Sequence, residues 1–297
     1  MGVSIELIKQ LRHETGAGVL DAKQALVSSG GDYEQALRAL RERGLAKVAK
    51  RAGRATTEGR VESRDRDGKV GLLVEVNCET DFVGRNQDFL AFAGSMADHF
   101  FSFSKEGQAL EEVMALPLSE GQGITPNETL QGLISATGEN MAVRRFTRFE
   151  LGDRSGLVEV YMHPGNRVAV MVEVNSETPA GANQEAFVTL THDLALHIAA
   201  LNPLCLTRED VPGESIGAQK EIWRKQALDE GKPEAIIDRI IQGRLKKYYE
   251  SSVLVEQSFV KDDEIKIGDL LKQAVSTVGE EITIRRFVRF ELGEALD

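Results

Sequence analysis

The sequence contains an internal repeat, which constrains the fold because each copy has to form the same supersecondary unit. Residues 70–80 (VGLLVEVNCET) align with residues 168–178 (VAVMVEVNSET) at an offset of 98. Residues 138–152 (GENMAVRRFTRFELG) align with residues 279–293 (GEEITIRRFVRFELG) at an offset of 141. Both ends of one unit are therefore duplicated, and because 141 exceeds 98 by 43, the second copy holds about 43 residues that the first lacks.

Each copy has the sequence pattern of a small α+β unit. Apolar residues alternate with other residues from Val70 in the first copy and from Val168 in the second, which predicts a half-buried strand in each. A helix is expected after each strand, over residues 87–101 and 184–201, and the Arg-Arg-Phe segment then forms a closing strand. We therefore expect an α+β fold with a duplicated core.

The extra residues of the second copy are predicted to form an antiparallel helical hairpin. Between residues 207 and 250, two segments with apolar residues at helical spacing flank the break Gly231-Lys232-Pro233. The apolar positions are Ile222, Trp223 and Ala227 before the break, and Ile236, Ile237, Ile240, Ile241 and Leu245 after it. This apolar surface exceeds what two helices hide from each other, so we expect the hairpin to pack on another surface as well.

The first 55 residues are predicted to form a three-helix module and a linker. Apolar residues recur at helical spacing in three stretches, of which the first ends at Thr15-Gly16 and the second at Gly30-Gly31. Asp32 stands three residues before Gln35, like a capping box at the start of the third helix. The chain is thus expected to divide into residues 1–55, residues 56–155, residues 156–206 with 251–297, and residues 207–250.

Charge and composition exclude several classes of protein. The formal net charge of −11 disfavours sequence-independent nucleic-acid binding, which depends on neutralising phosphates with Lys and Arg. No apolar run approaches the roughly 18 residues of a membrane span. The start of the chain has no export signal, and two cysteines are too few for a disulfide framework. We expect a cytoplasmic protein whose partners are proteins, with no direct nucleic-acid or membrane contact.

Motifs for covalent chemistry are missing from the sequence. His192 and His197 are five residues apart, which does not place them on one helix face as zinc ligands. The run Gly16-Ala17-Gly18 lies between two predicted helices and lacks the Gly-Lys-Ser/Thr of a phosphate loop. We predict no catalytic residue, no metal and no cofactor. An enzyme with an unrecognised site stays open as a competing hypothesis, which turnover of a small substrate by the purified protein alone would support.

Two arginine-rich features have structural alternatives to binding. Residues 41–54 hold six basic residues and one acidic residue, and could contact RNA or an acidic protein face, or form a solvated helix end and hinge. A ribosome- or RNA-binding module that uses this run is the second competing hypothesis. The Arg-Arg-Phe segments recur with the whole repeat, so we expect their aromatic rings to face the core. Their arginines are expected to be solvated or to pair with Glu150 and Glu291.

The loop after the first strand is the candidate functional site, because there the two copies differ. Each strand ends in Glu-Thr, but the first copy continues Asp81-Phe82-Val83 and the second continues with Pro179-Ala180. A loop at a strand end that carries an aromatic beside a carboxylate is a natural interaction tip. The alternative is that Phe82 folds back into its own core.

Two signatures in the right order resemble the elongation factor Ts family, and the resemblance covers essentially the whole chain. Residues 15–26 (TGAGVLDAKQAL) are similar to the N-terminal module of that family, a fold like ubiquitin-associated domains. Residues 75–83 (EVNCETDFV) are similar to its second signature, and the Arg-Arg-Phe strand and the hairpin also match. The resemblance implies a guanine-nucleotide exchange factor without covalent chemistry, whose partner in translation elongation is elongation factor Tu.

The resemblance also implies roles for individual residues. In that family the Asp-Phe loop is understood to wedge into the GTPase domain of elongation factor Tu and to dislodge the Mg²⁺ that helps to hold GDP. Carried over, Phe82 is the wedge, Asp81 its polar neighbour, and Thr80 and Val83 the frame. The implied partner contacts are Arg12, Val19, Leu20, Lys23, His163, Ile240 and Ile241. Whether the surplus apolar face of the hairpin pairs with a second copy, in a homodimer, or lies on the partner stays open.

Overall fold

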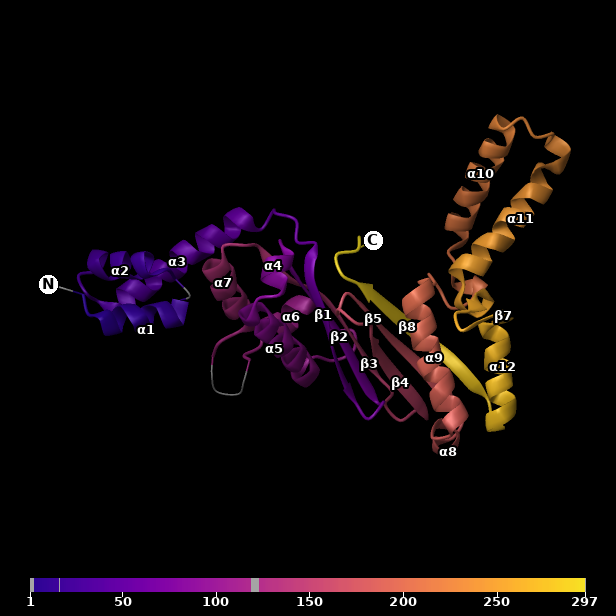
Figure 1. Ribbon diagram of the computed structural model, residues 1–297, viewed down its shortest axis with the longest axis horizontal. Helices are drawn as coiled ribbons and strands as arrows, with labels where there is room; N and C mark the ends of the chain where they lie inside the picture. The colour runs from indigo at the N-terminus through magenta and orange to yellow at the C-terminus, as the bar shows by residue number, and fades with distance from the viewer. Residues whose placement is uncertain (1–2, 16, 119–122, 297) are drawn as a thin grey trace.

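The computed structural model describes residues 3–15, 17–118 and 123–296. It has an elongated shape, with a helical module at the N-terminal end, two small antiparallel sheets in the middle and a helical hairpin at the far end (Figure 1). Helices and antiparallel strands occur together, which confirms the predicted α+β class. The four-part division of the chain stays a prediction.

Three helices form the N-terminal module, as predicted: α1 (Ile5–Thr15), α2 (Val19–Ser28) and α3 (Tyr33–Arg51). Leu11, Leu26 and Leu37 are among the residues of their small shared core. The Asp32 side chain accepts a hydrogen bond from the Gln35 amide at 3.0 Å, which confirms the predicted start of the third helix. That helix is longer than expected, because it continues to Arg51 through much of the basic run. The likeness to ubiquitin-associated domains stays a prediction, and Gly16 lies outside the described residues.

Two three-stranded antiparallel sheets confirm the internal repeat. The first has the order β1 (Glu58–Arg66), β2 (Val70–Cys78), β3 (Met141–Glu150), and the second β4 (Gly156–Met162), β5 (Val168–Ser176), β8 (Ile282–Glu291). The register shifts at equivalent positions, between Glu75 and Val76 in one sheet and between Glu173 and Val174 in the other. Such a shared bulge shows that the copies match in backbone detail.

Helices cover the outer face of each sheet. On the first half they are α4 (Asp81–Gly84), α5 (Gln87–Phe103), α6 (Leu110–Met114) and α7 (Pro126–Thr137). On the second half they are α8 (Pro179–Ala182), α9 (Glu185–Leu201) and α12 (Ile267–Val278). The predicted helices after each strand are therefore confirmed as α5 and α9. The helices α7 and α12 were not predicted, although they too repeat at the offset of 141.

The central strands are buried on both faces, so the prediction of half-buried strands was wrong. In β2, Leu72, Val74 and Val76 pack against the helices, whereas Leu73 packs with residues of the other sheet. The two sheets thus lie face to face between two helical layers (Figure 1). Gly71 permits this contact, because a Cβ there would lie 2.8 Å from both Val158 and Val160.

The two halves also exchange backbone hydrogen bonds in a reciprocal way. The Val61 amide donates to the Asn166 carbonyl at 2.8 Å, and the Val158 amide donates to the Gly68 carbonyl at 2.7 Å. Within each half, an equivalent hydrogen bond joins the Leu151 amide to the Lys69 carbonyl at 2.8 Å and the Leu292 amide to the Arg167 carbonyl at 2.7 Å. The turn between the first two strands of each half therefore accepts a hydrogen bond from the first strand of the other half. The two contacts are equivalent, as in an isologous interface.

The insertion forms the predicted antiparallel hairpin, with η1 (Arg208–Asp210), α10 (Gly213–Asp229) and α11 (Glu234–Ser252). Ala227, Ile237 and Ile241 form its core, with Trp223 packed against them. The hairpin extends away from the sheets (Figure 1). Its outer apolar residues Ile222 and Leu228 are half exposed, at 50% and 51%. The expected packing on another surface is not supplied by the described chain and stays a prediction for a partner or a second copy.

The chain returns from the hairpin to the second half through η2 (Leu254–Glu256), β6 (Ser258–Phe259) and β7 (Asp262–Lys266). Within the described ranges, none of the helices is both long enough and apolar enough to cross a bilayer.

Candidate functional site

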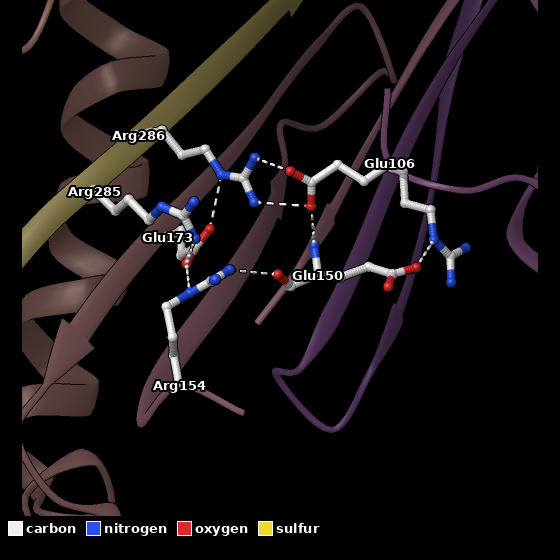
Figure 2. Close-up of polar contacts among 7 residues, drawn as sticks. Glu106, Glu150, Arg154, Glu173, Arg285 and Arg286 are labelled. Carbon is white, nitrogen blue, oxygen red and sulfur yellow. Dashed lines mark hydrogen bonds and ion pairs between the residues drawn. The ribbon is translucent and has the colours of Figure 1, made fainter. Parts of the chain in front are cut away.

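Paired arginines hold a buried glutamate at the centre of each half. Glu75 is fully buried and accepts from Arg144 at 3.1 Å and from Arg145 at 2.6 Å. Glu173 is the equivalent residue, and Figure 2 shows it among Arg154, Arg285 and Arg286, at 2.9, 3.1 and 2.7 Å. A buried carboxylate has to be paired, so these contacts explain why the arginines recur with the repeat.

This arrangement corrects the predicted ion pairs. The Arg-Arg pairs do not bind Glu150 and Glu291 through their side chains; those carboxylates pair with Arg148 and Arg289, at 2.5 and 2.8 Å. The sequence signal that was missed is the glutamate between two valines, which stands at the same place in both copies. The predicted placement of the aromatic rings is confirmed, because Phe146 and Phe287 pack against the cores of their halves.

The end of the chain completes the Glu75 cluster. The Gly293 amide donates to Glu75 Oε1 at 2.9 Å, and Arg145 Nη2 donates to Glu294 Oε1 at 2.6 Å. Burial alone would raise the pKa of Glu75, but the hydrogen bonds from Gly293, Asn77 and Arg145 outweigh it and lower this pKa below its ordinary value. Glu75 is therefore held as a carboxylate that ties the second half to the first.

The candidate loop is a capped helical turn. Thr80 is the N-cap of α4, and its hydroxyl accepts a hydrogen bond from the Val83 amide at 3.4 Å. The Val83 side chain is partly buried against the core of the first half, together with Leu90. Thr80 caps the turn and Val83 attaches it to the core of the first half.

A carboxylate from another part of the first half anchors this cap. Glu139 follows α7 after Gly138, whose φ of 82° reverses the chain direction. Its Oε1 accepts from the Thr80 hydroxyl at 2.7 Å, and its Oε2 accepts from the Thr80 amide at 3.1 Å. Glu139 was not among the predicted site residues, although a Gly-Glu pair at this place in both copies marks it as a shared position.

Phe82 projects from this anchored turn, and together with Asp81 it forms what we call the tip. Its side chain is 84% exposed, so the alternative that it folds back into its own core is wrong. Asp81 is also exposed and forms an ion pair with Arg85 at 3.2 Å on the same turn. An exposed pair of this kind contributes little to stability, which leaves Asp81 available to other partners.

The second copy has the same capped turn, held by a glutamate, without the aromatic side chain. Thr178 caps α8 by accepting from the Gly181 amide at 3.1 Å, and Glu280 accepts from its hydroxyl at 2.8 Å and its amide at 3.2 Å. The backbone angles of the two caps agree, with φ of −127° and ψ of 154° at Thr80 against −127° and 155° at Thr178. The Thr178-Pro179 turn is therefore the same scaffold without the exposed aromatic side chain.

A polar cleft lies beside the tip, where the two halves meet. Its volume is about 410 Å³, and Asp81 and Arg85 line it together with Gly165, Asn166 and Arg167 of the β4–β5 turn. Arg167 pairs with Glu58 of β1 at 2.7 Å across the junction. His163 stands at the start of the same turn, exposed, with Nδ1 3.0 Å from the Tyr161 hydroxyl. The structure thus brings the β4–β5 turn of the second half close to the tip.

The other predicted contact residues fall into two separate groups. Arg12, Val19, Leu20 and Lys23 are all exposed on α1 and α2, with Leu20 at 81%. In the hairpin, Ile240 is partly exposed, whereas Ile241 is 4% exposed and belongs to the hairpin core. The predicted contacts of both groups, and the predicted role of the tip, stay untested.

The basic run is attached to the first half at its C-terminal end. Arg51 Nη1 donates to the Ile134 carbonyl at 3.5 Å, and Arg54 pairs with Glu79 at 3.4 Å. The side chains at positions 41 and 45–49 lie outside the described residues.

The histidines considered as metal ligands have other contacts: His192 Nδ1 lies 2.7 Å from Glu159, and the buried His197 Nε2 lies 2.9 Å from Gln257. In the described part of the chain, no group of three His, Cys, Asp or Glu is placed to hold a metal ion.

The chain is thus an α+β protein with a duplicated core. One copy of that core presents an exposed aromatic side chain, Phe82, on an anchored turn. The family model described as elongation factor TS matches residues 79–294. Proteins named elongation factor Ts from Clostridium perfringens (strain SM101 / Type A) and Symbiobacterium thermophilum are 44% and 39% identical to the chain. These alignments cover 99% of this chain in both cases, and 94% and 93% of the relatives. The chain belongs to the elongation factor Ts family, whose members are nucleotide exchange factors of translation elongation and not catalysts of covalent chemistry.

Proposed function

We propose that this protein is the guanine-nucleotide exchange factor for elongation factor Tu, and that it promotes GDP release by inserting Phe82 into that GTPase. The observation that carries the proposal is the exposure of Phe82, at 84%, on a turn that is anchored at both its cap and its apolar side. When a partner buries a large apolar side chain that was exposed to solvent, the free energy of the complex is lowered.

The size of this gain is sufficient for exchange. Burying a phenylalanine side chain is worth roughly 1.5–3 kcal/mol, which favours a distorted partner over an undistorted one by about tenfold to a hundredfold. Because α4 is already ordered by Thr80, little conformational entropy is lost when the tip is buried. The free energy of burial is then available to deform the partner.

The proposed point of deformation is the Mg²⁺ site of the partner. In such GTPases Mg²⁺ bridges protein and phosphate oxygens, so its displacement weakens the binding of GDP. Thr80, Asp81, Phe82 and Val83 are the residues we assign to this step. Linkage gives the same result in thermodynamic terms, because a factor that binds the nucleotide-free GTPase more tightly has to loosen GDP by the same factor.

Other surfaces contribute affinity in this proposal. Arg12, Val19, Leu20 and Lys23 place an exposed mixed apolar and basic surface on α1 and α2. His163 presents an imidazole beside the tip. We also assign a partner contact to the hairpin, where Ile240 touches the partner and Ile241 holds α11 in place from the hairpin core. The setting is the cytoplasm, where translation takes place.

The test is the release of a fluorescent GDP analogue from elongation factor Tu in the presence of excess GTP. We expect wild-type protein to accelerate release and Phe82→Ala to reduce the acceleration by about tenfold to a hundredfold, because the apolar contact is lost. Val188→Ala is the matched control, since it removes an apolar side chain that is 43% exposed on α9. The functional proposal is wrong if wild-type protein leaves the release rate unchanged.

A further inference from the structure

We propose that Glu139 is a positioning residue that aims Phe82 by acting through Thr80; this inference rests on the proposed function. Glu139 reaches the tip from a segment 59 residues further along the chain and takes both donors of Thr80, the amide and the hydroxyl. Both contacts are hydrogen bonds to a carboxylate, which are about twice as strong as neutral ones.

The second of these contacts decides how Thr80 caps the turn. A threonine hydroxyl has one proton, and here the proton is directed to Glu139 at 2.7 Å. The lone pairs of the hydroxyl oxygen are thereby left to face the Val83 amide, which donates to it at 3.4 Å. A hydroxyl that donates to a carboxylate is also a better acceptor, so the two hydrogen bonds support each other.

The result is a fixed rotation of α4 about its own axis. Successive residues of a helical turn point about 100° apart, so a turn held with Val83 toward the core has to point Phe82 elsewhere. Val83 packs on the apolar core, and Glu139 holds the opposite end of the same turn at Thr80. With these two attachments, Phe82 points into solvent at 84% exposure.

The second half provides an internal comparison. Glu280 holds Thr178 by the same two hydrogen bonds, but the turn carries Pro179 and Ala180 in place of the tip. Gly181 stands where the first half has Val83, and a Cβ on Gly181 would overlap the Glu280 carboxylate. The second turn is therefore held by its glutamate and by Ala182, which is buried in the core of the second half, but it carries no projecting ring, so loss of that glutamate has no tip to misdirect.

The experiment compares Glu139→Ala with Glu280→Ala in the full chain. Two readouts need no partner: amide hydrogen exchange at Val83 and Gly181, and the fluorine NMR signal of 4-fluorophenylalanine placed at position 82. The third readout is acceleration of fluorescent GDP release. We expect Glu139→Ala to speed exchange of the Val83 amide about tenfold, to change the fluorine signal and to reduce GDP release several-fold. Glu139→Gln, which keeps one acceptor, should fall between Ala and wild type.

The control should separate positioning from general stability. We expect Glu280→Ala to speed exchange of the Gly181 amide while GDP release stays within about twofold of wild type. Equal losses of GDP release in the two alanine variants would mean a general loss of stability and would overturn the inference. A wild-type rate of GDP release from Glu139→Ala would overturn it as well. If wild-type protein fails to accelerate release, the proposed function fails, and the Val83 and fluorine readouts still decide whether Glu139 holds the tip.

Discussion

At the scale of single residues, Cys78 shows how firmly the base of the tip is buried. Its thiol donates to the Thr80 carbonyl at 3.1 Å and is fully buried at the end of β2. Burial, with the nearby charge of Glu139, raises the pKa of the Cys78 thiol to about 12. The thiolate is the reactive form, so Cys78 is protected from alkylation and oxidation in two ways: reagents cannot reach the buried sulfur, and the thiol stays protonated.

We therefore predict selective labelling of the native protein by iodoacetamide at pH 8. Cys205 is partly exposed and should react, whereas at most about one Cys78 side chain in ten thousand is a thiolate at that pH. Both should react in urea. Mass spectrometry of the digested protein measures the two rates, and equal labelling of the two cysteines in native protein would contradict the described burial.

The candidate site could be predicted only in part from the sequence. The difference between Asp81-Phe82 and Pro179-Ala180 in otherwise matched copies pointed to the tip without any coordinates. The Gly-Glu pair that recurs in both copies marks Glu139 as a shared position, but its hydrogen bonds with Thr80 depend on how the end of α7 lies against the end of β2, which the sequence alone does not give. Exposure of Phe82 was equally undecided, since an aromatic at a strand end can pack inward or outward.

At the scale of elements, the charged edge strand β1 was the hardest to predict. β1 has the sequence EGRVESRDR, in which Val61 is the one apolar residue, so no alternation of apolar residues marks it as a strand. It forms because β2 offers a complete row of backbone partners over the whole length of β1. Arg64 adds an ion pair with Asp98 at 2.6 Å, which ties this strand to α5. Tertiary pairing therefore overrides a poor local pattern.

The contact between the two sheets leads to a prediction at Gly71. We expect Gly71→Ala to lower the free energy of unfolding by about 1–3 kcal/mol, because the new methyl group overpacks the interface near Val158, Val160 and Met171. Gly217→Ala in α10 is the control, since its Cβ meets open space and alanine favours a helix. Urea unfolding measures both. A Gly71 variant as stable as wild type would mean that the sheets separate easily.

At the scale of the whole molecule, charged contacts connect the two halves. Figure 2 shows both carboxylate oxygens of Glu106, in the first half, accepting from Arg286 of the second, and Glu106 Oε2 also accepts from the Glu150 amide at 3.1 Å. The hydrogen bond from Arg286 lowers the pKa of Glu106 below its ordinary value, with a smaller contribution from the Glu150 amide. The contact between Glu106 and Arg286 was beyond prediction from the sequence, because it joins residues 180 positions apart.

The lowered pKa of Glu106 predicts a specific dependence of stability on pH. A carboxyl whose pKa is lower in the folded state stabilises the fold above its unfolded pKa, and this contribution is lost as pH falls through the folded pKa. We expect Glu106→Gln to be less stable than wild type at pH 7, by less than about 1 kcal/mol because the pair is partly exposed, with the difference vanishing at acid pH. Urea unfolding at pH 7 and pH 3 measures it.

The control for this prediction is Glu221→Gln, which removes an exposed carboxylate on α10, away from the junction of the halves. A difference between Glu106→Gln and wild type that persists unchanged at pH 3 would show that the effect comes from packing and not from the charge.

The reciprocal hydrogen bonds between the halves, from Val61 to Asn166 and from Val158 to Gly68, have a consequence for stoichiometry. Two identical subunits joined by such a two-fold contact would present two tips and two hairpins, on opposite sides of the axis. A single chain that contains both copies breaks that symmetry: one copy keeps Phe82 and the other carries α10 and α11. The described chain thus presents one exposed aromatic tip, on the first half, and one helical hairpin, on the second, so the molecule is polar along its length although its core is symmetric.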